Sequence, residues 1–143
     1  RFANVIGPRS NHGVIPDFIK KLENDPQTLE ILGDGTQSKS YLLVEEVVEA
    51  MVHGVANSKE PVNILNLGTD DWVSVARIAE IVVEECGLKG VELKFTGGKR
   101  GWKGDVPRIM LDTSKMKALG WKPRHGSEDA VRSVARAMAK GAR

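Results

Sequence analysis

The sequence is poor in cysteine, in aromatic residues and in long apolar runs. Its 143 residues include one cysteine, Cys86, so no disulfide can form within the chain. Aromatic residues make up 5% of the chain, and no apolar run approaches the roughly 18 residues that cross a membrane. No secretory signal is evident. Cys86 lies on the apolar side of an expected helix, so we interpret it as a buried thiol and expect a cytoplasmic protein without a membrane partner.

Neither sign of charge is in large excess, because 21 basic and 19 acidic side chains give a net charge of +2. The segment 94–108 is the exception, with five cations and the single acid Asp105. Such a local cluster favours an anion site over a nucleic-acid surface, which usually spreads its basic residues more widely. A minor alternative is a nucleic-acid surface built from 94–108 and the basic tail, which contains Arg132, Arg136, Lys140 and Arg143.

The three histidines and the cysteine show no metal-ligand spacing, so we predict no metal site. No Ser-His-Asp or Cys-His nucleophile pattern is evident either.

Hydrophobic periodicity predicts an α/β protein of one domain, residues 1–143, in which short strands alternate with about five helices. Parallel pairing through crossover helices is expected at least once. Strands are expected at 1–6, 29–32, 41–44, 62–67 and 91–95, and helices at 16–24, up to 56, 74–86, 113–119 and from 127 onward.

Three features of this pattern make specific predictions about burial and capping. The stripe Val44, Val47, Val48, Met51, Val52 and Val55 has helical spacing and is expected to form core. The strand 62–67 is expected to be buried. Ser74 and Ser127 precede apolar helical patterns and are expected to be N-caps.

The segment 31–46 contains a Gly-Asp-Gly turn followed by a polar run, and we interpret it as a ligand-facing loop. Gly33 and Gly35 allow a tight turn and close approach of a ligand. The next five residues, 36–40, provide one cation, Lys39, and four neutral polar groups, which suits an anionic ligand rich in hydroxyls. A solvated hairpin loop is the alternative for this stretch alone.

Other motifs accompany this loop in order. They are Arg1-Phe-Ala-Asn4 followed by Gly7-Pro8, Asn66-Leu-Gly68, Gly101-Trp-Lys-Gly-Asp-Val-Pro107 and Lys117-Ala-Leu-Gly-Trp-Lys-Pro123. Together they resemble the C-terminal half of the nucleotide-sugar epimerases and dehydratases, the extended short-chain dehydrogenase/reductases, closest in type to UDP-glucose 4-epimerase. The resemblance runs from Arg1 to about Met138.

The resemblance implies the substrate-binding C-terminal region of a Rossmann-type enzyme, with most of the Rossmann sheet missing. The N-terminal dinucleotide-binding half would be absent, so the chain would be a piece of a longer protein. It would bind no cofactor itself, whereas the parent enzyme would use NAD. Strands 1–6 and 62–67 would belong to the incomplete sheet, whose open edge could pair with a second copy.

The resemblance also implies a site for a nucleotide-diphosphate sugar, a UDP-sugar by type. Asn4 and Lys39 would contact the diphosphate, although relatives more often have Arg at the position of Lys39. Val14, with Gly13 and Ile15, would offer backbone groups at a helix start. Ile31, Leu32 and Gly33 would run along the base and ribose, and Arg100 and Lys103 would form a second phosphate clamp. Trp102 could pack on the ligand or anchor its own loop.

Enzymes of this family use a Tyr-x-x-x-Lys pair as the base, and this chain lacks it. The single tyrosine is Tyr41, and Glu45 stands four residues after it. We therefore assign no catalytic residue and predict the substrate-binding region of an epimerase or dehydratase. The alternative from another class is a non-catalytic nucleotide-binding or assembly module on the same scaffold.

The first testable prediction is that the 143-residue chain alone does not interconvert nucleotide sugars. The reason is that the chain lacks the glycine-rich cofactor motif and the Tyr-x-x-x-Lys pair of the family. A turnover assay with UDP-glucose and NAD measures this, and product above the no-protein control would contradict it.

Overall fold

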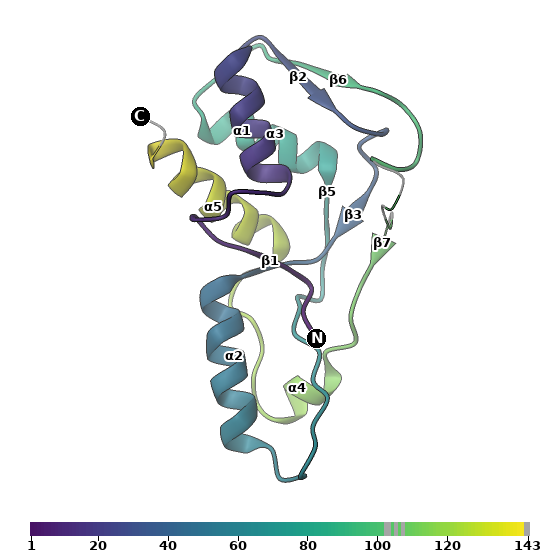
Figure 1. Cartoon of the computed structure of the whole chain (residues 1–143), viewed down its shortest axis with the longest axis vertical. Coiled ribbons are helices and arrows are strands. Elements are labelled where there is room, and N and C mark those ends of the chain that lie inside the picture. Colours follow the sequence, from purple (N-terminus) through teal and green to yellow (C-terminus); the bar gives the residue numbers. More distant parts are fainter. Residues whose placement is uncertain (102–103, 105, 107, 142–143) are drawn as a thin grey trace.

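The structure, a computed structural model, describes residues 1–101, 104, 106 and 108–141. Within these residues the fold is α/β, as predicted (Figure 1). The helices are α1 (Val14–Asn24), α2 (Val44–Asn57), α3 (Val75–Glu85), α4 (Ser114–Ala118) and α5 (Ser127–Gly141). The strands are β1 (Asn4–Ile6), β2 (Thr28–Ile31), β3 (Ser38–Lys39), β4 (Tyr41–Leu43), β5 (Val73–Ser74), β6 (Glu92–Phe95) and β7 (Arg108–Ile109).

The described strands form three small sheets. β1 pairs with β4 in parallel, and β2 pairs with β6 in parallel. In the third sheet, β3 lies between β5, which is antiparallel to it, and β7, which is parallel. The expected parallel pairing is therefore confirmed. The short strands β3, β5 and β7 were not predicted, because two residues are too few to show an alternating pattern.

The core divides into two clusters, which correspond to the upper and lower parts of Figure 1. The larger cluster lies among α1, α3, α5 and β2, with Phe18, Leu29 and Ile78 at less than 4% exposure. The smaller cluster joins α2 to α4 through Leu42, Val47 and Met116. The strand β4 contributes to both, through Tyr41 and Leu42, and so connects the two parts.

The helix α2 contradicts the predicted burial of its valine stripe. Val47 is buried, but Val52 is 67% exposed and Val55 is 84% exposed, and Val44, Val48 and Met51 are also exposed. The buried side of α2 consists of Glu46, Val47, Ala50 and Gly54. Helical spacing identifies an apolar face, but it cannot tell whether anything covers that face.

The segment 62–67 also differs from the prediction of a buried strand. Val62 is 80% exposed and Ile64 is 55% exposed. A single parallel bridge joins Phe2 to Leu67, with the Leu67 N–H donating to the Arg1 carbonyl over 2.8 Å. Leu67 alone of these is buried, at 4% exposure. A buried strand needs a hydrogen-bonded neighbouring strand and a layer of side chains packed against its face. Most of this segment has neither within the described residues.

The helix caps follow the prediction at Ser74 but not at Ser127. The Ser74 side chain accepts a hydrogen bond from the Arg77 N–H, as an N-cap does. Ser127 instead is the first residue of α5, and its N–H donates to both carboxylate oxygens of Asp71, at 2.9 and 3.1 Å. The start of α5 is thus capped by a carboxylate 56 residues earlier in the sequence.

Glu46, which is 1% exposed, fastens the segment before α5 to α2. Its Oε1 accepts hydrogen bonds from the backbone N–H groups of Arg124, at 2.7 Å, and His125, at 3.3 Å.

Among the described residues no helix is long and apolar enough to cross a membrane.

The second testable prediction concerns Asp71. Burial opposes ionisation of its carboxyl, but hydrogen bonds from Ser127 and Thr69 outweigh burial and lower the pKa. A lowered pKa stabilises the fold fully above about pH 4, and this contribution is lost as the pH falls through the lowered value. Asp71→Asn should therefore destabilise the protein by about 1 kcal/mol at pH 7.

Urea denaturation of both proteins from pH 7 down to pH 2 measures this. The difference between the wild type and Asp71→Asn should shrink as the pH falls below about 4. A difference that stays constant with pH would mean that the charge of Asp71 contributes nothing.

Candidate functional site

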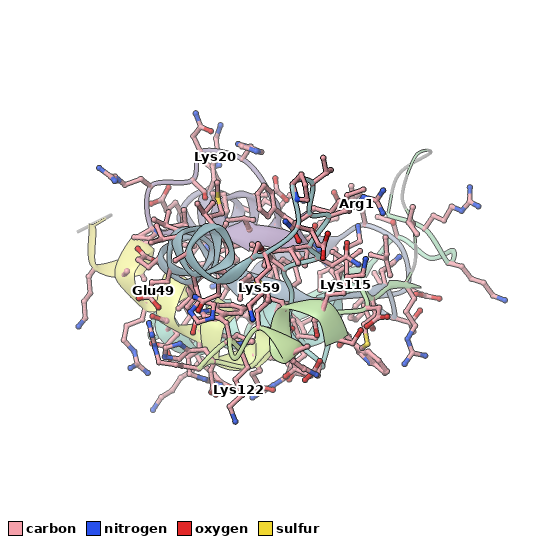
Figure 2. The ribbon with its side chains drawn as sticks, turned by 90° about the horizontal axis from the view of Figure 1, so that it is seen from below. Arg1, Lys20, Glu49, Lys59, Lys115 and Lys122 are labelled. Atoms are coloured by element: carbon pink, nitrogen blue, oxygen red, sulfur yellow. The ribbon has the colours of Figure 1, made fainter. Side chains whose placement is uncertain are left out.

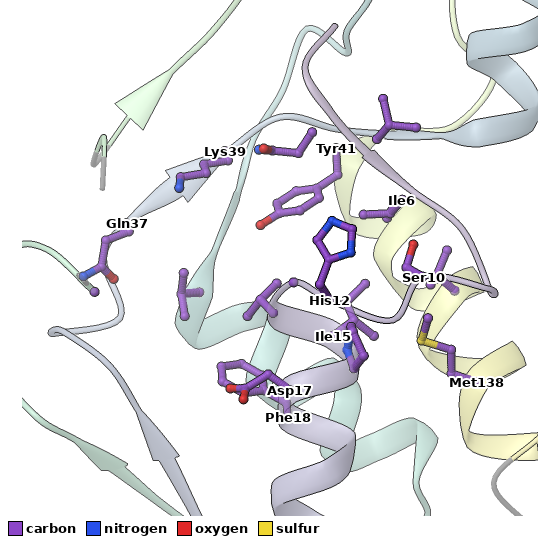
Figure 3. Close-up of a pocket in the computed structure, with 18 of the residues that line it drawn as sticks. Ile6, Ser10, His12, Ile15, Asp17, Phe18, Gln37, Lys39, Tyr41 and Met138 are labelled. Atoms are coloured by element: carbon purple, nitrogen blue, oxygen red, sulfur yellow. The ribbon is translucent and has the colours of Figure 1, made fainter. Parts of the chain in front are cut away.

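An open pocket of about 740 Å³ lies between β1, the start of α1 and the run from Gln37 to Tyr41 (Figure 3). Leu32 and Gly101 line one part of it, and Val134 and Met138 of α5 line another. Within the described residues it is therefore assembled from segments far apart in the sequence. Its walls combine apolar side chains with a small number of polar groups, as is common in small-molecule sites.

Three alternating residues, Gln37, Lys39 and Tyr41, line the pocket, and we refer to them as the pocket-facing row. Residues two apart on an extended strand point to the same side, which explains why all three reach the pocket. The intervening residues turn elsewhere, since the Ser38 hydroxyl donates to the Thr36 carbonyl and Ser40 is buried. Figure 3 shows His12, from the loop before α1, among the residues that line the pocket together with Tyr41.

Behind the row, three hydroxyl groups connect Ser40 to Asp71, and we call them the hydroxyl series. Ser40 Oγ lies 2.7 Å from Thr69 Oγ1, and Thr69 Oγ1 lies 2.7 Å from Ser127 Oγ. The Ser127 hydroxyl donates to Asp71 Oδ1 over 2.8 Å. Ser127 Oγ also accepts from the Tyr41 N–H, so the series holds the strand that carries the row.

The charge of Asp71 sets the direction of these hydrogen bonds. An ionised carboxylate only accepts, so the single hydrogen of Ser127 Oγ is used toward Asp71. Ser127 Oγ can then only accept from its hydroxyl neighbour, and the Thr69 hydroxyl has two acceptors within reach, Ser127 Oγ at 2.7 Å and the Asp71 carbonyl at 3.2 Å. Buried hydroxyls linked in this way polarise one another, which strengthens each hydrogen bond.

The start of α1 forms the opposite side of the pocket. Its N-cap is Gly13, which has a φ of +103° and supplies no side-chain hydrogen bond. The first N–H groups of the helix, together with its dipole, favour an anion at this position. Asp17, in the first turn, forms an ion pair with Lys21 at 3.0 Å. The pocket therefore places a helix N-terminus and the cation Lys39 around one space.

Gly33 shapes the wall beside Gln37. Its φ is +84°, and a Cβ built on it would lie 1.9 Å from Gln37 Nε2 and 3.2 Å from the Arg100 carbonyl carbon. Only glycine fits this position without displacing the Gln37 amide. The Gly33 N–H donates to Thr96 Oγ1 over 2.9 Å, which ties this turn to the end of β6.

The structure brings four of the predicted site residues together in the pocket, namely Asn4, Val14, Leu32 and Lys39. Ile31 is fully buried in the larger core cluster, and Gly33 is buried beneath Gln37. Arg100 is exposed beside the lining residue Gly101, and Lys103 lies outside the described residues, as do Trp102, Asp105 and Pro107. Their contacts with a ligand stay a prediction.

Sequence analysis did not single out His12, Gln37 or Tyr41 as site residues. No alternating signal marks the row in the sequence, because the intervening residues, Ser38 and Ser40, are polar as well. No signal points to His12 either, whose place depends on how its loop returns to α1.

Several of the cations that a nucleic-acid surface would need are already paired with other side chains of this protein. Arg132 and Arg136 both bind Glu85, at 3.1 and 2.8 Å. Arg108 stacks on the Trp72 ring, 3.6 Å from its centroid. Figure 2 shows the labelled Lys20 and Lys122 at opposite edges of the view rather than on one face.

Among the described residues, no group of three His, Cys, Asp or Glu side chains could hold a metal ion.

Comparison with known proteins defines the class. Residues 1–68 match the NAD dependent epimerase/dehydratase family. Over these residues the chain matches the family, and over nearly its whole length it is related to UDP-glucose and UDP-galactose 4-epimerases. It spans less than half the length of the relatives that it matches.

Three relatives illustrate the similarity. A crystal structure of a UDP-galactose 4-epimerase is 40% identical, with a TM-score of 0.84 over 99% of this chain and 44% of that one. The UDP-glucose 4-epimerase of Thermotoga maritima, solved with UDP-glucose, is 28% identical, with a TM-score of 0.79 over 100% of this chain and 46% of that one. A Methanocaldococcus jannaschii protein provisionally named a UDP-glucose 4-epimerase is 31% identical over 94% of this chain and 43% of its own length.

Dinucleotide sites of this fold class use a Gly-x-Gly-x-x-Gly turn between a strand and a helix. The loop from β1 to α1 has the widely spaced Gly7 and Gly13, and the full sequence contains no such motif.

The third testable prediction is that Gly33→Ala destabilises the fold more than Gly97→Ala. Both glycines have a φ of +84°, so both substitutions carry the same backbone strain of about 1–2 kcal/mol. A Cβ at Gly97 meets nothing within 4 Å, whereas a Cβ at Gly33 displaces the Gln37 amide. Urea denaturation compares them, and equal losses would show that the contact with Gln37 costs nothing.

Proposed function

We propose that this chain is the substrate-binding region of an NAD-dependent sugar-nucleotide epimerase, with UDP-glucose 4-epimerase as the parent activity. The region lies C-terminal to the NAD-binding half of the parent protein and forms one domain, residues 1–143. It binds a nucleotide-diphosphate sugar, and the parent enzyme works in the cytoplasm.

The observation that carries the proposal is the convergence of Lys39, the Asn4 amide and the start of α1 on one pocket. A diphosphate has two negative charges and several acceptor oxygens. A lysine ammonium group, an amide and free helix N–H groups together provide the donors that such a group needs. Binding of UDP-glucose to the Thermotoga maritima relative supports the same choice of ligand.

Lysine at position 39 has a physical consequence for this binding. Its ammonium group keeps the charge of the arginine that the family more often has, but not the planar fork that binds two oxygens at once. The contribution of Lys39 is therefore mainly Coulombic, so the affinity should fall with added salt.

In this proposal the chain positions the substrate and does not carry out the chemistry. Lys39, Asn4 and the α1 N-terminus hold the diphosphate, and Tyr41 forms part of the wall beside it. NAD, when bound in the parent enzyme, accepts a hydride from the sugar and returns it. Fixing the diphosphate while the sugar remains free to turn permits return of the hydride to either face.

The exposed apolar side of α2 supports the placement within a longer enzyme. Val48, Met51 and Val52 are each at least half exposed and lie on one side of the helix. Contiguous apolar surface of this kind commonly marks an interface. The remaining half of the epimerase fold is the cover that the proposal assigns to it.

The second candidate is a non-catalytic nucleotide-binding or assembly module on the same scaffold, and the same surface favours its assembly form. In that case a second copy of this chain would cover α2, or would pair along the open edge beside Val62 and Ile64. The two candidates differ in whether the pocket binds a nucleotide sugar.

The fourth testable prediction is that the isolated chain binds UDP-glucose and that Lys39→Ala and Arg100→Ala each weaken binding about tenfold. Isothermal titration at low salt measures it. Lys59→Ala is the matched control, because Lys59 is an exposed lysine that does not line the pocket, and it should leave the affinity unchanged.

Absence of binding by a folded wild-type chain would count against the proposal. If that chain also self-associates as its concentration rises, the assembly module is the better description. Binding that Lys39→Ala leaves intact would remove Lys39 from the site.

A further inference from the structure

Gln37 is the most unusual polar residue of the pocket. It is 1% exposed, and neither its Oε1 nor its Nε2 has a hydrogen-bond partner among the residues that the structure describes. Buried side-chain amides are nearly always paired, because leaving them unpaired forfeits their hydration. An unpaired amide at a pocket wall therefore suggests a partner that arrives with a ligand.

The hydrogen bond that Gln37 contributes to the fold comes from its backbone, not from its side chain. The Gln37 carbonyl accepts a hydrogen bond from the N–H of Val75, the first residue of α3, over 2.9 Å. This bond would form with any side chain at position 37. A leucine of similar size would fill the same space without burying two unpaired polar atoms. Packing and backbone pairing alone thus give no reason for an amide here.

The position of Gln37 in the pocket suggests which part of a ligand it meets. It precedes Lys39 by two residues on the pocket-facing row, and its amide lies against Gly33. Leu32, which is 47% exposed, provides apolar surface at the same wall. A neutral amide next to an apolar side chain suits a nucleobase, whereas the charged groups farther along the row suit phosphate.

We propose that the Gln37 amide binds the imide edge of the uracil ring in a UDP-sugar. Uracil presents the N3–H donor next to the O4 acceptor, and an amide presents the complementary pair. Oε1 would accept from N3–H while Nε2 donates to O4, so both unpaired atoms gain partners at once. This inference rests on the proposed function and assigns the base-recognising residue of that site.

The amide reaches the ligand by turning at its own side chain. The terminal torsion of glutamine is broad, so a rotation there needs no change in the backbone. The Gly33 turn makes room for the amide itself, because a Cβ at Gly33 would collide with Gln37 Nε2.

The test is a set of four titrations, with wild type and Gln37→Leu each binding UDP and N3-methyl-UDP. In wild type, methylation of N3 should weaken binding about tenfold by blocking the donor. Gln37→Leu should weaken UDP binding by a similar factor, and methylation should then cost little more. Such non-additivity is the signature of a direct contact between the two groups.

Ser38→Ala is the matched control, because the Ser38 hydroxyl donates to the Thr36 carbonyl and Ser38 does not line the pocket. It should retain the full methylation penalty. Without ligand, Gln37→Leu should be at least as stable as wild type in urea, since it removes an unpaired buried amide. A purely structural role would instead lower its stability and leave the methylation penalty unchanged.

The outcomes separate the two proposals. If wild type binds neither UDP nor UDP-glucose, the proposed function fails, and the role of Gln37 fails with it. If wild type binds UDP but Gln37→Leu binds it equally well, or if both show the same methylation penalty, only the role of Gln37 is overturned.

Discussion

The hydrogen bonds that converge on Asp71 hold the candidate site in place. Its carboxylate receives the N–H and the hydroxyl of Ser127, and through Thr69 it connects to Ser40. Three parts of the chain meet there, namely the strand that carries the pocket-facing row, the loop before β5 and the start of α5. Because the three hydroxyls are buried and are satisfied by one another and by Asp71, removing any one of them leaves the others unpaired. The pocket therefore depends on a network whose members do not line it.

Local features of the structure were accessible from the sequence. Periodic apolar residues and Ser74 predicted α3 almost to its ends, and α1 begins only two residues before the expected start at Pro16. The glycines at 33 and 35 and the polar run after them lie in the segment from which Leu32, Gln37 and Lys39 line the pocket, and the contact of this loop with a ligand stays a prediction. Such features are encoded within a turn or two of the chain, where backbone preference and side-chain spacing decide the outcome.

Features that depend on distant partners were not accessible in the same way. The cap of α5 comes from Asp71 rather than from Ser127, and no local pattern identifies a capping group so far away. The valines of α2 have the spacing of a core helix, yet Val52 and Val55 are exposed because no described segment covers them. Burial is a property of the assembled fold, so apolar spacing alone predicted a face without identifying its partner.

Along residues 37–41, side chains that line the pocket alternate with side chains that turn away from it, so neighbouring residues have different roles. Odd positions face the pocket, whereas Ser40 is committed to the hydroxyl series behind it. Removing or adding one residue between Gly35 and Ser40 would exchange these sets, turning Lys39 toward the interior and a serine toward the ligand. During evolution this stretch should therefore tolerate exchanges of side chains far better than changes of length, unlike most surface loops.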